Sequence, residues 1–145
     1  MARGTIPSEL GLLTGLTTVL DIQDNQFSGL IPTELGLLTK LPELDMNNNK
    51  LTGPIPSEFG QLTSMGRLSF ASNFLSGMVP RELSFLHLSL HTLMLDGNPN
   101  LSGTVPAELC LLNGTCLDSI LLPCREPFGL SFDCSTLICG CECSC

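Results

Sequence analysis

Leu51-Thr52-Gly53-Pro54-Ile55-Pro56-Ser57-Glu58-Phe59-Gly60 is one copy of a phrase, Gly-x-[Ile/Val]-Pro-x-Glu-[Leu/Phe], that recurs along the chain. The copies begin at Gly4, Gly29, Gly53, Gly77 and Gly103, so their spacings are 25, 24, 24 and 26 residues. A phrase repeated at this period is typical of a solenoid, in which each copy forms one coil and neighbouring coils share a core.

Composition is consistent with a folded chain whose core is aliphatic. Hydrophobic residues make up 43% of the 145 residues and charged residues 14%, and the chain contains no Trp and no Tyr. The net charge of -8 argues against nucleic acid as a partner, because binding to phosphates requires basic patches. A chain of this length is expected to form one domain with a substantial core.

A second pattern lies between the copies of the phrase. Residues 41–51 read Leu-x-x-Leu-x-Met-x-x-Asn-x-Leu, and residues 65–75 read Met-x-x-Leu-x-Phe-x-x-Asn-x-Leu. The first and fourth repeats carry the same pattern with one extra residue each. This pattern resembles the template of leucine-rich repeats, and the 24-residue length with its L-[ST]-G-x-I-P ending resembles the plant-type subclass. The resemblance covers residues 4–109.

Each coil can also be interpreted from its residues. The alternation at Leu44-x-Met46 predicts a short strand with one buried face, and neighbouring strands should pair in parallel. The Asn column should satisfy backbone groups where the chain leaves the strand. The Pro of each phrase is expected at the first position of a short helix or 3-10 turn, and the Glu in its first turn. The Asn column consists of Asn25, Asn49, Asn73 and Asn98.

The sequence therefore predicts an α/β repeat fold, a right-handed leucine-rich-repeat solenoid of about four full coils over residues 1–109. Parallel strands are expected on the concave face and 3-10 or short helical turns on the convex face. The absence of an apolar leader before Gly4 suggests that the N-terminal end is truncated. No apolar run is long enough to span a membrane.

Residues 110–145 are expected to form a Cys-rich C-terminal cap. All eight cysteines lie in this segment, and an even number of closely spaced cysteines favours disulfides in an oxidising compartment. The C-x-C-x-C-x-C ending leaves thiolate binding of soft metals as an alternative, which counting free thiols before and after reduction would test. The sequons at Asn100 and Asn113 agree with secretion. The cysteines are Cys110, Cys116, Cys124, Cys134, Cys139, Cys141, Cys143 and Cys145.

The outward positions of the strands are the candidate ligand-binding residues, because solenoids usually bind through their concave face. Asp21 and Asp45 are expected side by side in a neighbourhood with little positive charge, which favours a basic or polar partner. The alternative is a solvated face that binds nothing. The candidates are Asp21, Gln23, Asp24, Glu43, Asp45, Asn47, Arg67, Ser69 and Asp96.

Catalytic motifs are missing from the sequence: it contains no G-x-S-x-G, no Walker loop and no H-E-x-x-H. His87 and His91 have helical spacing but no further ligand at matching positions, so no metal and no cofactor are expected. The Glu of each phrase is interpreted as stabilising a helix N-terminus.

The resemblance implies a non-catalytic module for recognition of a protein or peptide, similar to the ectodomains of receptor-like kinases and to secreted algal repeat proteins with Cys-rich tails. The implied location is extracellular or at the cell surface. Two alternatives remain open. One is a structural surface or matrix protein without a specific ligand, and the other is an inhibitor of a secreted glycosidase.

Overall fold

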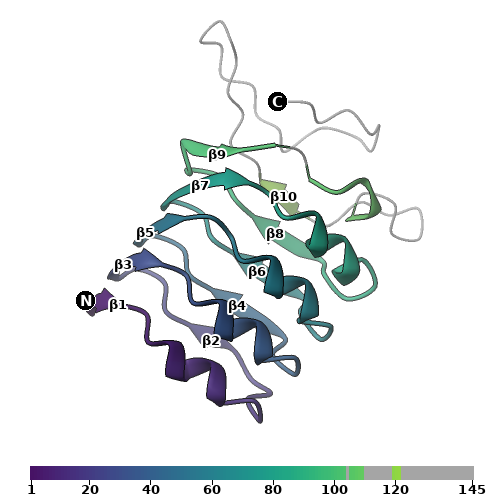
Figure 1. Ribbon diagram of the computed structural model, residues 1–145, viewed down its shortest axis with the longest axis horizontal. Coiled ribbons are helices and arrows are strands. Elements are labelled where there is room, and N and C mark those ends of the chain that lie inside the picture. Colours follow the sequence, from purple (N-terminus) through teal and green to yellow (C-terminus); the bar gives the residue numbers. More distant parts are fainter. Residues whose placement is uncertain (104, 110–118, 122–145) are drawn as a thin grey trace, which may run out of the picture.

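The computed structural model describes residues 1–103, 105–109 and 119–121 of the chain. Figure 1 shows similar coils stacked from β1 to β9, with the 3-10 helices along one side. The strands are β1 Arg3–Thr5, β2 Leu20–Asp21, β3 Gln26–Leu30, β4 Glu43–Asp45, β5 Lys50–Gly53, β6 Arg67–Ser69, β7 Phe74–Met78, β8 Thr92–Met94, β9 Asn100–Ser102 and β10 Ser119–Leu121. The 3-10 helices are η1 Ser8–Leu12, η2 Thr33–Leu37, η3 Ser57–Gln61, η4 Arg81–Leu86 and η5 Ala107–Leu109.

The strands that the Leu-x-Leu alternation predicts form one parallel sheet, here called sheet II, with the order β10-β8-β6-β4-β2. Its register aligns Leu44 with Leu68 and Leu68 with Leu93, and all three side chains are fully buried. Alternation along each strand places the residues before and after this leucine on the opposite face. The parallel strands and the 3-10 turns confirm the predicted repeat fold.

A second parallel sheet, here called sheet I, was not expected from the sequence. It contains β1, β3, β5, β7 and β9 in that order. It uses the segment between the Asn column and the Pro of each phrase, which the sequence suggested to be a core contact followed by a bend. Gly29, Gly53 and Gly77 lie in these strands with φ of 82°, 77° and 82°. A residue with positive φ is atypical of a strand, so the pairing becomes evident only when the copies are stacked.

The Pro of each phrase lies one position earlier than expected. Pro7, Pro32, Pro56 and Pro80 immediately precede the 3-10 helices, with φ of -68° to -62° and ψ of 130° to 133°. The fixed φ of proline suits this extended conformation as well as a helix. The Pro carbonyl begins the 3-10 pattern, as in the hydrogen bond from Phe59 N to Pro56 O at 3.2 Å. The Glu lies in the first turn as predicted.

The core is a continuous aliphatic column between the two sheets and the 3-10 helices. Its largest buried side chains include Phe59 and Phe70, whose rings stack with centroids 5.8 Å apart. The buried Ile31, Ile55 and Val79 fill the second core column that the Gly-x-[Ile/Val]-Pro phrase predicts.

Several predictions fall largely outside the described residues. They are the cap at 110–145, the eight cysteines with their disulfides, and the sequon at Asn113. Within 110–145 the structure describes only β10, whose backbone pairs with β8 in sheet II. Asn100 of the first sequon is an exposed residue at the start of β9.

Candidate functional site

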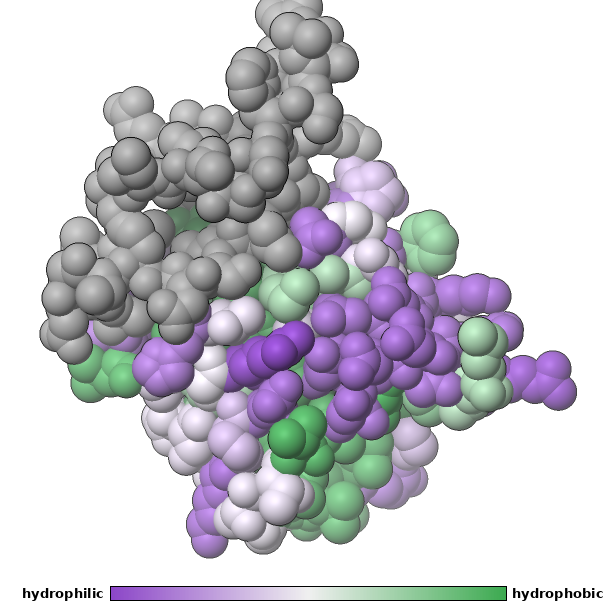
Figure 2. All heavy atoms as spheres, turned by 180° about the vertical axis from the view of Figure 1, so that it is seen from behind, coloured by the Kyte–Doolittle hydropathy of each residue, from purple (hydrophilic) through white to green (hydrophobic). Residues whose placement is uncertain are grey.

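The outward positions of sheet II form rows that cross the coils. The register aligns Asp21 with Asp45, Asp45 with Ser69 and Ser69 with Met94. A parallel row contains Glu43, Arg67 and Thr92. The two rows arise because the residues on either side of each buried leucine point away from the core. We number the coils by their sheet II strands, so that coils 1 to 4 contain β2, β4, β6 and β8. The register brings the strand candidates of coils 1 to 3 onto one face. Figure 2 shows hydrophilic side chains gathered over this side of the molecule.

A third row follows at the ends of the strands. Hydrogen bonds from Asp24 N to Asn47 O, from Asn48 N to Ala71 O and from Ser72 N to Asp96 O connect successive coils at this level. Gln23, Asn47, Ala71 and Asp96 occupy equivalent positions in the four coils. The next residues, Asp24, Asn48 and Ser72, have φ of 54° to 56°, and Gly97 has φ of 69°. This left-handed residue turns the chain away from the sheet.

The Asn column holds these turns in place from inside. The Asn73 amide nitrogen donates to Met46 O at 2.9 Å, Phe70 O at 3.0 Å and Ala71 O at 3.2 Å. The Asn73 Oδ1 accepts from Leu51 N at 3.0 Å. Asn49 and Asn98 repeat the arrangement one coil away on either side. Each of these amides therefore connects two coils and fixes the strand ends that carry the candidate residues.

Arg67 changes the electrostatics expected for this face. Its Nε lies 3.5 Å from Glu43 Oε1 and 3.3 Å from Ser69 Oγ, and its Nη2 lies 3.5 Å from Asp45 Oδ2. The expectation of little positive charge beside Asp45 is therefore wrong for coil 2. The stacked pair of Asp21 and Asp45 exists in register, but a guanidinium from coil 3 faces one of its members.

Burial divides the candidates into two groups. Asp45, Asn47 and Ser69 are 4%, 8% and 0% exposed, so they lie beneath the surface and not on it. Asp45 Oδ1 and Asn47 Oδ1 accept hydrogen bonds from the backbone of Asn47 and Ala71. The accessible members are the exposed Asp21, Gln23, Asp24 and Arg67, and the half-buried Glu43 and Asp96. Only this second group can touch a partner directly.

Replacing Arg67 with methionine should lower the free energy of unfolding by about 1 to 2 kcal/mol, because it leaves the buried Asp45 carboxylate without its cation. Urea unfolding followed by circular dichroism measures the change. The matched control is Arg81→Met, since the Arg81 side chain is 94% exposed in its pair with Glu82 and should change stability by less than about 0.5 kcal/mol. Equal effects of the two variants would contradict the role assigned to Arg67.

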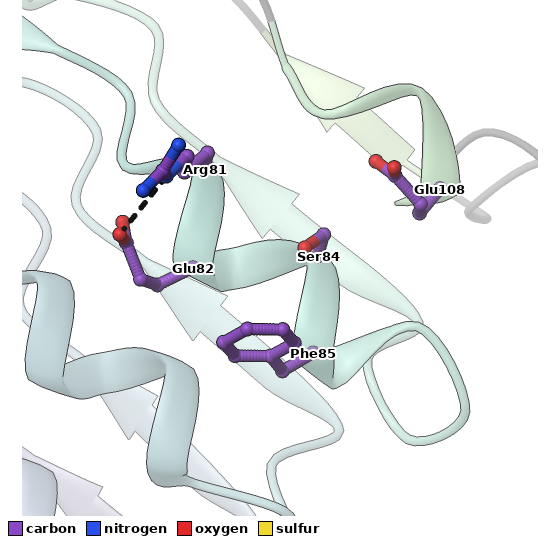
Figure 3. A pocket seen from close by; sticks show the side chains of 5 residues that line it. All are labelled: Arg81, Glu82, Ser84, Phe85 and Glu108. Atoms are coloured by element: carbon purple, nitrogen blue, oxygen red, sulfur yellow. Dashed lines mark hydrogen bonds and ion pairs between the residues drawn. The ribbon is translucent and has the colours of Figure 1, made fainter.

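The sequence did not point to a hollow between η4 and η5. It measures about 320 Å³ and is lined by Arg81, Glu82, Ser84 and Phe85 of η4 and by Glu108 of η5 (Figure 3). In the earlier coils the residue equivalent to Ser84 is a glycine. At Gly36 an added Cβ would lie 2.7 Å from Glu58 O, so the closest stacking requires glycine. The sequence did contain an indication of this hollow, because the glycine in Leu35-Gly36 is replaced by serine in the equivalent Leu83-Ser84.

This hollow is a gap in coil stacking rather than a built binding site. Its two carboxylates belong to the Glu column, and Glu82 pairs with Arg81 at 3.3 Å (Figure 3). Among the residues that the structure describes, no group of three or more His, Cys, Asp or Glu side chains is arranged to hold a metal ion. In the same part of the chain, no helix is long and apolar enough to cross a membrane.

The repeats match a family model. The model described as Leucine Rich Repeat matches residues 17–38 and 40–62. No curated protein sequence matches the chain.

Solved plant structures are similar to this chain over most of its length. The BIR3–SERK2 complex from Arabidopsis thaliana gives 36% identity over 70% of this chain and 52% of that chain, with a TM-score of 0.60. The ectodomain of the membrane receptor kinase GASSHO1/SCHENGEN3 from Arabidopsis thaliana is 39% identical over 83% of this chain and 14% of that chain, with a TM-score of 0.74. The PEPR1–AtPEP1 structure is 34% identical over 76% of this chain and 15% of that chain, with a TM-score of 0.70. The chain thus spans about half of the first and a small part of the other two.

Proposed function

Because this chain is a leucine-rich-repeat protein of the plant type, we propose that it is a non-catalytic module that recognises a protein or peptide through the outward face of sheet II. The observation that carries the proposal is a set of accessible polar side chains on this face that the core does not use. Asp21, Gln23 and Asp24 are exposed, and Arg67 is 44% exposed at its side chain.

Two of the similar structures support this class of function. The GASSHO1/SCHENGEN3 ectodomain was solved with CASPARIAN STRIP INTEGRITY FACTOR 2, and PEPR1 was solved with AtPEP1. The face of sheet II is rigid, because the buried Asn column hydrogen-bonds each strand end to the neighbouring coil. A rigid surface lowers the entropy that binding must overcome.

The proposal also covers location and the C-terminal segment. An extracellular or cell-surface location agrees with similarity to receptor ectodomains and with the exposed sequon at Asn100. We retain residues 110–145 as a disulfide-linked cap, on the basis of the cysteine spacing alone. A matrix spacer and a glycosidase inhibitor are the alternatives. A spacer would bind nothing specifically, and an inhibitor would bind a folded enzyme in preference to peptides.

Three exposed glutamines make a matched test, since each lies on a different face. Gln23 lies two residues after β2 at the edge of sheet II, Gln26 on β3 of sheet I and Gln61 on η3. Peptides are selected on the wild-type chain from a displayed random library, and a photo-crosslinking residue is placed at each position in turn. We expect crosslinks from Gln23 and background from the other two. Crosslinks from Gln26 or Gln61 alone would place binding elsewhere, and a library that yields no binder would favour the spacer.

A further inference from the structure

Sheet I carries large apolar side chains that the core does not bury. Leu30, Phe74 and Met78 are 64%, 54% and 72% exposed, and they are here called the sheet I patch. The register connects its members across the strands, because Leu30 aligns with Thr52 and Thr52 aligns with Phe74. Exposed apolar side chains that gather on one face favour association unless something covers them.

The glycine of each phrase accounts for part of the patch but does not bury it. A Cβ added at Gly53 would collide with Leu30 Cδ2, and a Cβ added at Gly103 would lie 3.4 Å from Met78 Cβ. Leu30 and Met78 therefore lie over the glycine of the next strand and cover its backbone. Their outer surfaces remain open to solvent.

Asn100 lies beside this patch at the edge of the described part of sheet I. It is the exposed first residue of β9, and β9 is the last strand in the order of sheet I (Figure 1). Asn100-Leu101-Ser102 is the one N-x-[ST] sequon within the described strands of this sheet. The other long strands begin with Gln26, Lys50 and Phe74.

The register places Asn100 between the two apolar side chains of β7. Ser76 aligns with Asn100, and Met78 aligns with Ser102. Phe74, Ser76 and Met78 are accessible, whereas Leu75 between the first two is buried. With strands about 4.8 Å apart and a rise of about 3.3 Å per residue, the Asn100 Cα lies roughly 8 Å from those of Phe74 and Met78. The small side chain directly opposite Asn100 leaves room between them.

We propose that Asn100 carries an N-linked glycan whose first sugars pack over Ser76, between Phe74 and Met78, and cover this end of the sheet I patch. The C–H faces of sugar rings pack against aromatic and apolar side chains, while the hydroxyl groups at the ring edges stay in water. A glycan is bulky and solubilising. It replaces an apolar surface beside an open strand edge with a hydrated one, and this opposes pairing of that edge with another chain.

Attachment is a group transfer from a lipid-linked diphospho-oligosaccharide. A bond forms between Asn100 Nδ2 and the anomeric carbon of the first sugar, and the bond from this carbon to the diphosphate breaks. The amide loses one proton and the lipid diphosphate leaves, so no oxidant or reductant takes part. The inference rests on the extracellular location proposed above and is independent of recognition through sheet II.

Secretion of the full chain from a eukaryotic host, behind a cleavable leader, tests the attachment. The Asn113→Gln variant keeps only the sequon at Asn100. Mass spectrometry of its peptides should find Asn100 modified. Secreted protein with an unmodified Asn100 would overturn the inference, and crosslinking from Gln23 would still decide the proposed function.

Oxidation by hydrogen peroxide tests whether the glycan covers the patch. Met78 should form its sulfoxide at least about threefold more slowly in the Asn113→Gln variant than in the double variant Asn100→Gln/Asn113→Gln, because a covered methionine is less accessible to the oxidant. Circular dichroism checks that both variants are folded. Equal Met78 rates in the two variants would show that the glycan does not cover the patch, and the inference would be wrong.

Two controls make the comparison specific. Met1 is 94% exposed and precedes β1, at the other end of the strand order from β9, so its oxidation rate should be the same in both variants. The single variant Asn100→Gln keeps the sequon at Asn113, and its Met78 should oxidise as fast as in the double variant. Protection of Met78 in Asn100→Gln would assign the cover to Asn113 and contradict the role proposed for Asn100.

Discussion

Asn73→Ala should lower the free energy of unfolding by about 3 kcal/mol, one of the largest losses expected from an uncharged polar side chain among the residues that the structure describes. Asn73 is 2% exposed, and its amide bonds to three carbonyls and one backbone N–H from two coils. Alanine would leave these groups buried and without partners, at about 1 kcal/mol or more for each that water does not reach. Urea unfolding followed by circular dichroism gives the change.

Asn25→Ala is the matched control at the open end of the column. Asn25 is only half-buried; its amide nitrogen donates to Ile22 O and Gln23 O of its own coil, and its Oδ1 accepts from Ala2 N at 2.6 Å in an exposed position. We expect a loss of about 1 kcal/mol there, because water can replace the amide. Asn73→Asp should be at least as harmful as Asn73→Ala, since a carboxylate would face three carbonyl oxygens. Similar losses for Asn25→Ala and Asn73→Ala would contradict the assigned hydrogen bonding.

Gly36→Ala should cost about 2 to 3 kcal/mol, because the new methyl group has no room between two coils. Its Cβ would lie 2.7 Å from both Glu58 O and Glu58 Cβ and 2.9 Å from Glu58 C, so the backbone of η3 would have to move. Forced overpacking of this kind typically costs about 1 to 3 kcal/mol. Thermal and urea unfolding measure the change.

Gly15→Ala controls for the general effect of replacing glycine. No atom lies within 4 Å of a Cβ built at Gly15, so this variant should be neutral or slightly stabilising. If Gly36→Ala is as stable as Gly15→Ala, the coils are not packed as closely as the structure indicates. The explanation of the hollow beside Ser84, as a gap where serine replaces the glycine needed for close stacking, would then also be wrong.

Much of the repeat architecture could be predicted from the sequence because each coil repeats the same residue types. The 24-residue period, the buried leucines of sheet II and the acidic first turn of each 3-10 helix all follow from local pattern. Sheet I could not be predicted in the same way. Its strands contain a glycine with positive φ, and their hydrogen bonds depend on the stacked neighbours rather than on the segment itself.

The candidate site was predictable in position but not in accessibility. Alternation along β4 and β6 places Asp45 and Ser69 on the outward side, as expected. Their burial depends on Arg67, whose long side chain extends from coil 3 to contact both of them. Which way such a side chain turns is not encoded in the repeat pattern. The same holds for Asp96, whose buried oxygen becomes evident only in three dimensions.

Photo-crosslinking from Gln23, compared with Gln26 and Gln61, tests most directly whether sheet II is the recognition surface. All three positions are exposed, so unequal yields report on the face and not on access to the crosslinker. The account predicts that a selected peptide crosslinks from Gln23 at about ten times the yield of either other position. Equal yields at the three glutamines, or a maximum at Gln26 or Gln61, would contradict it.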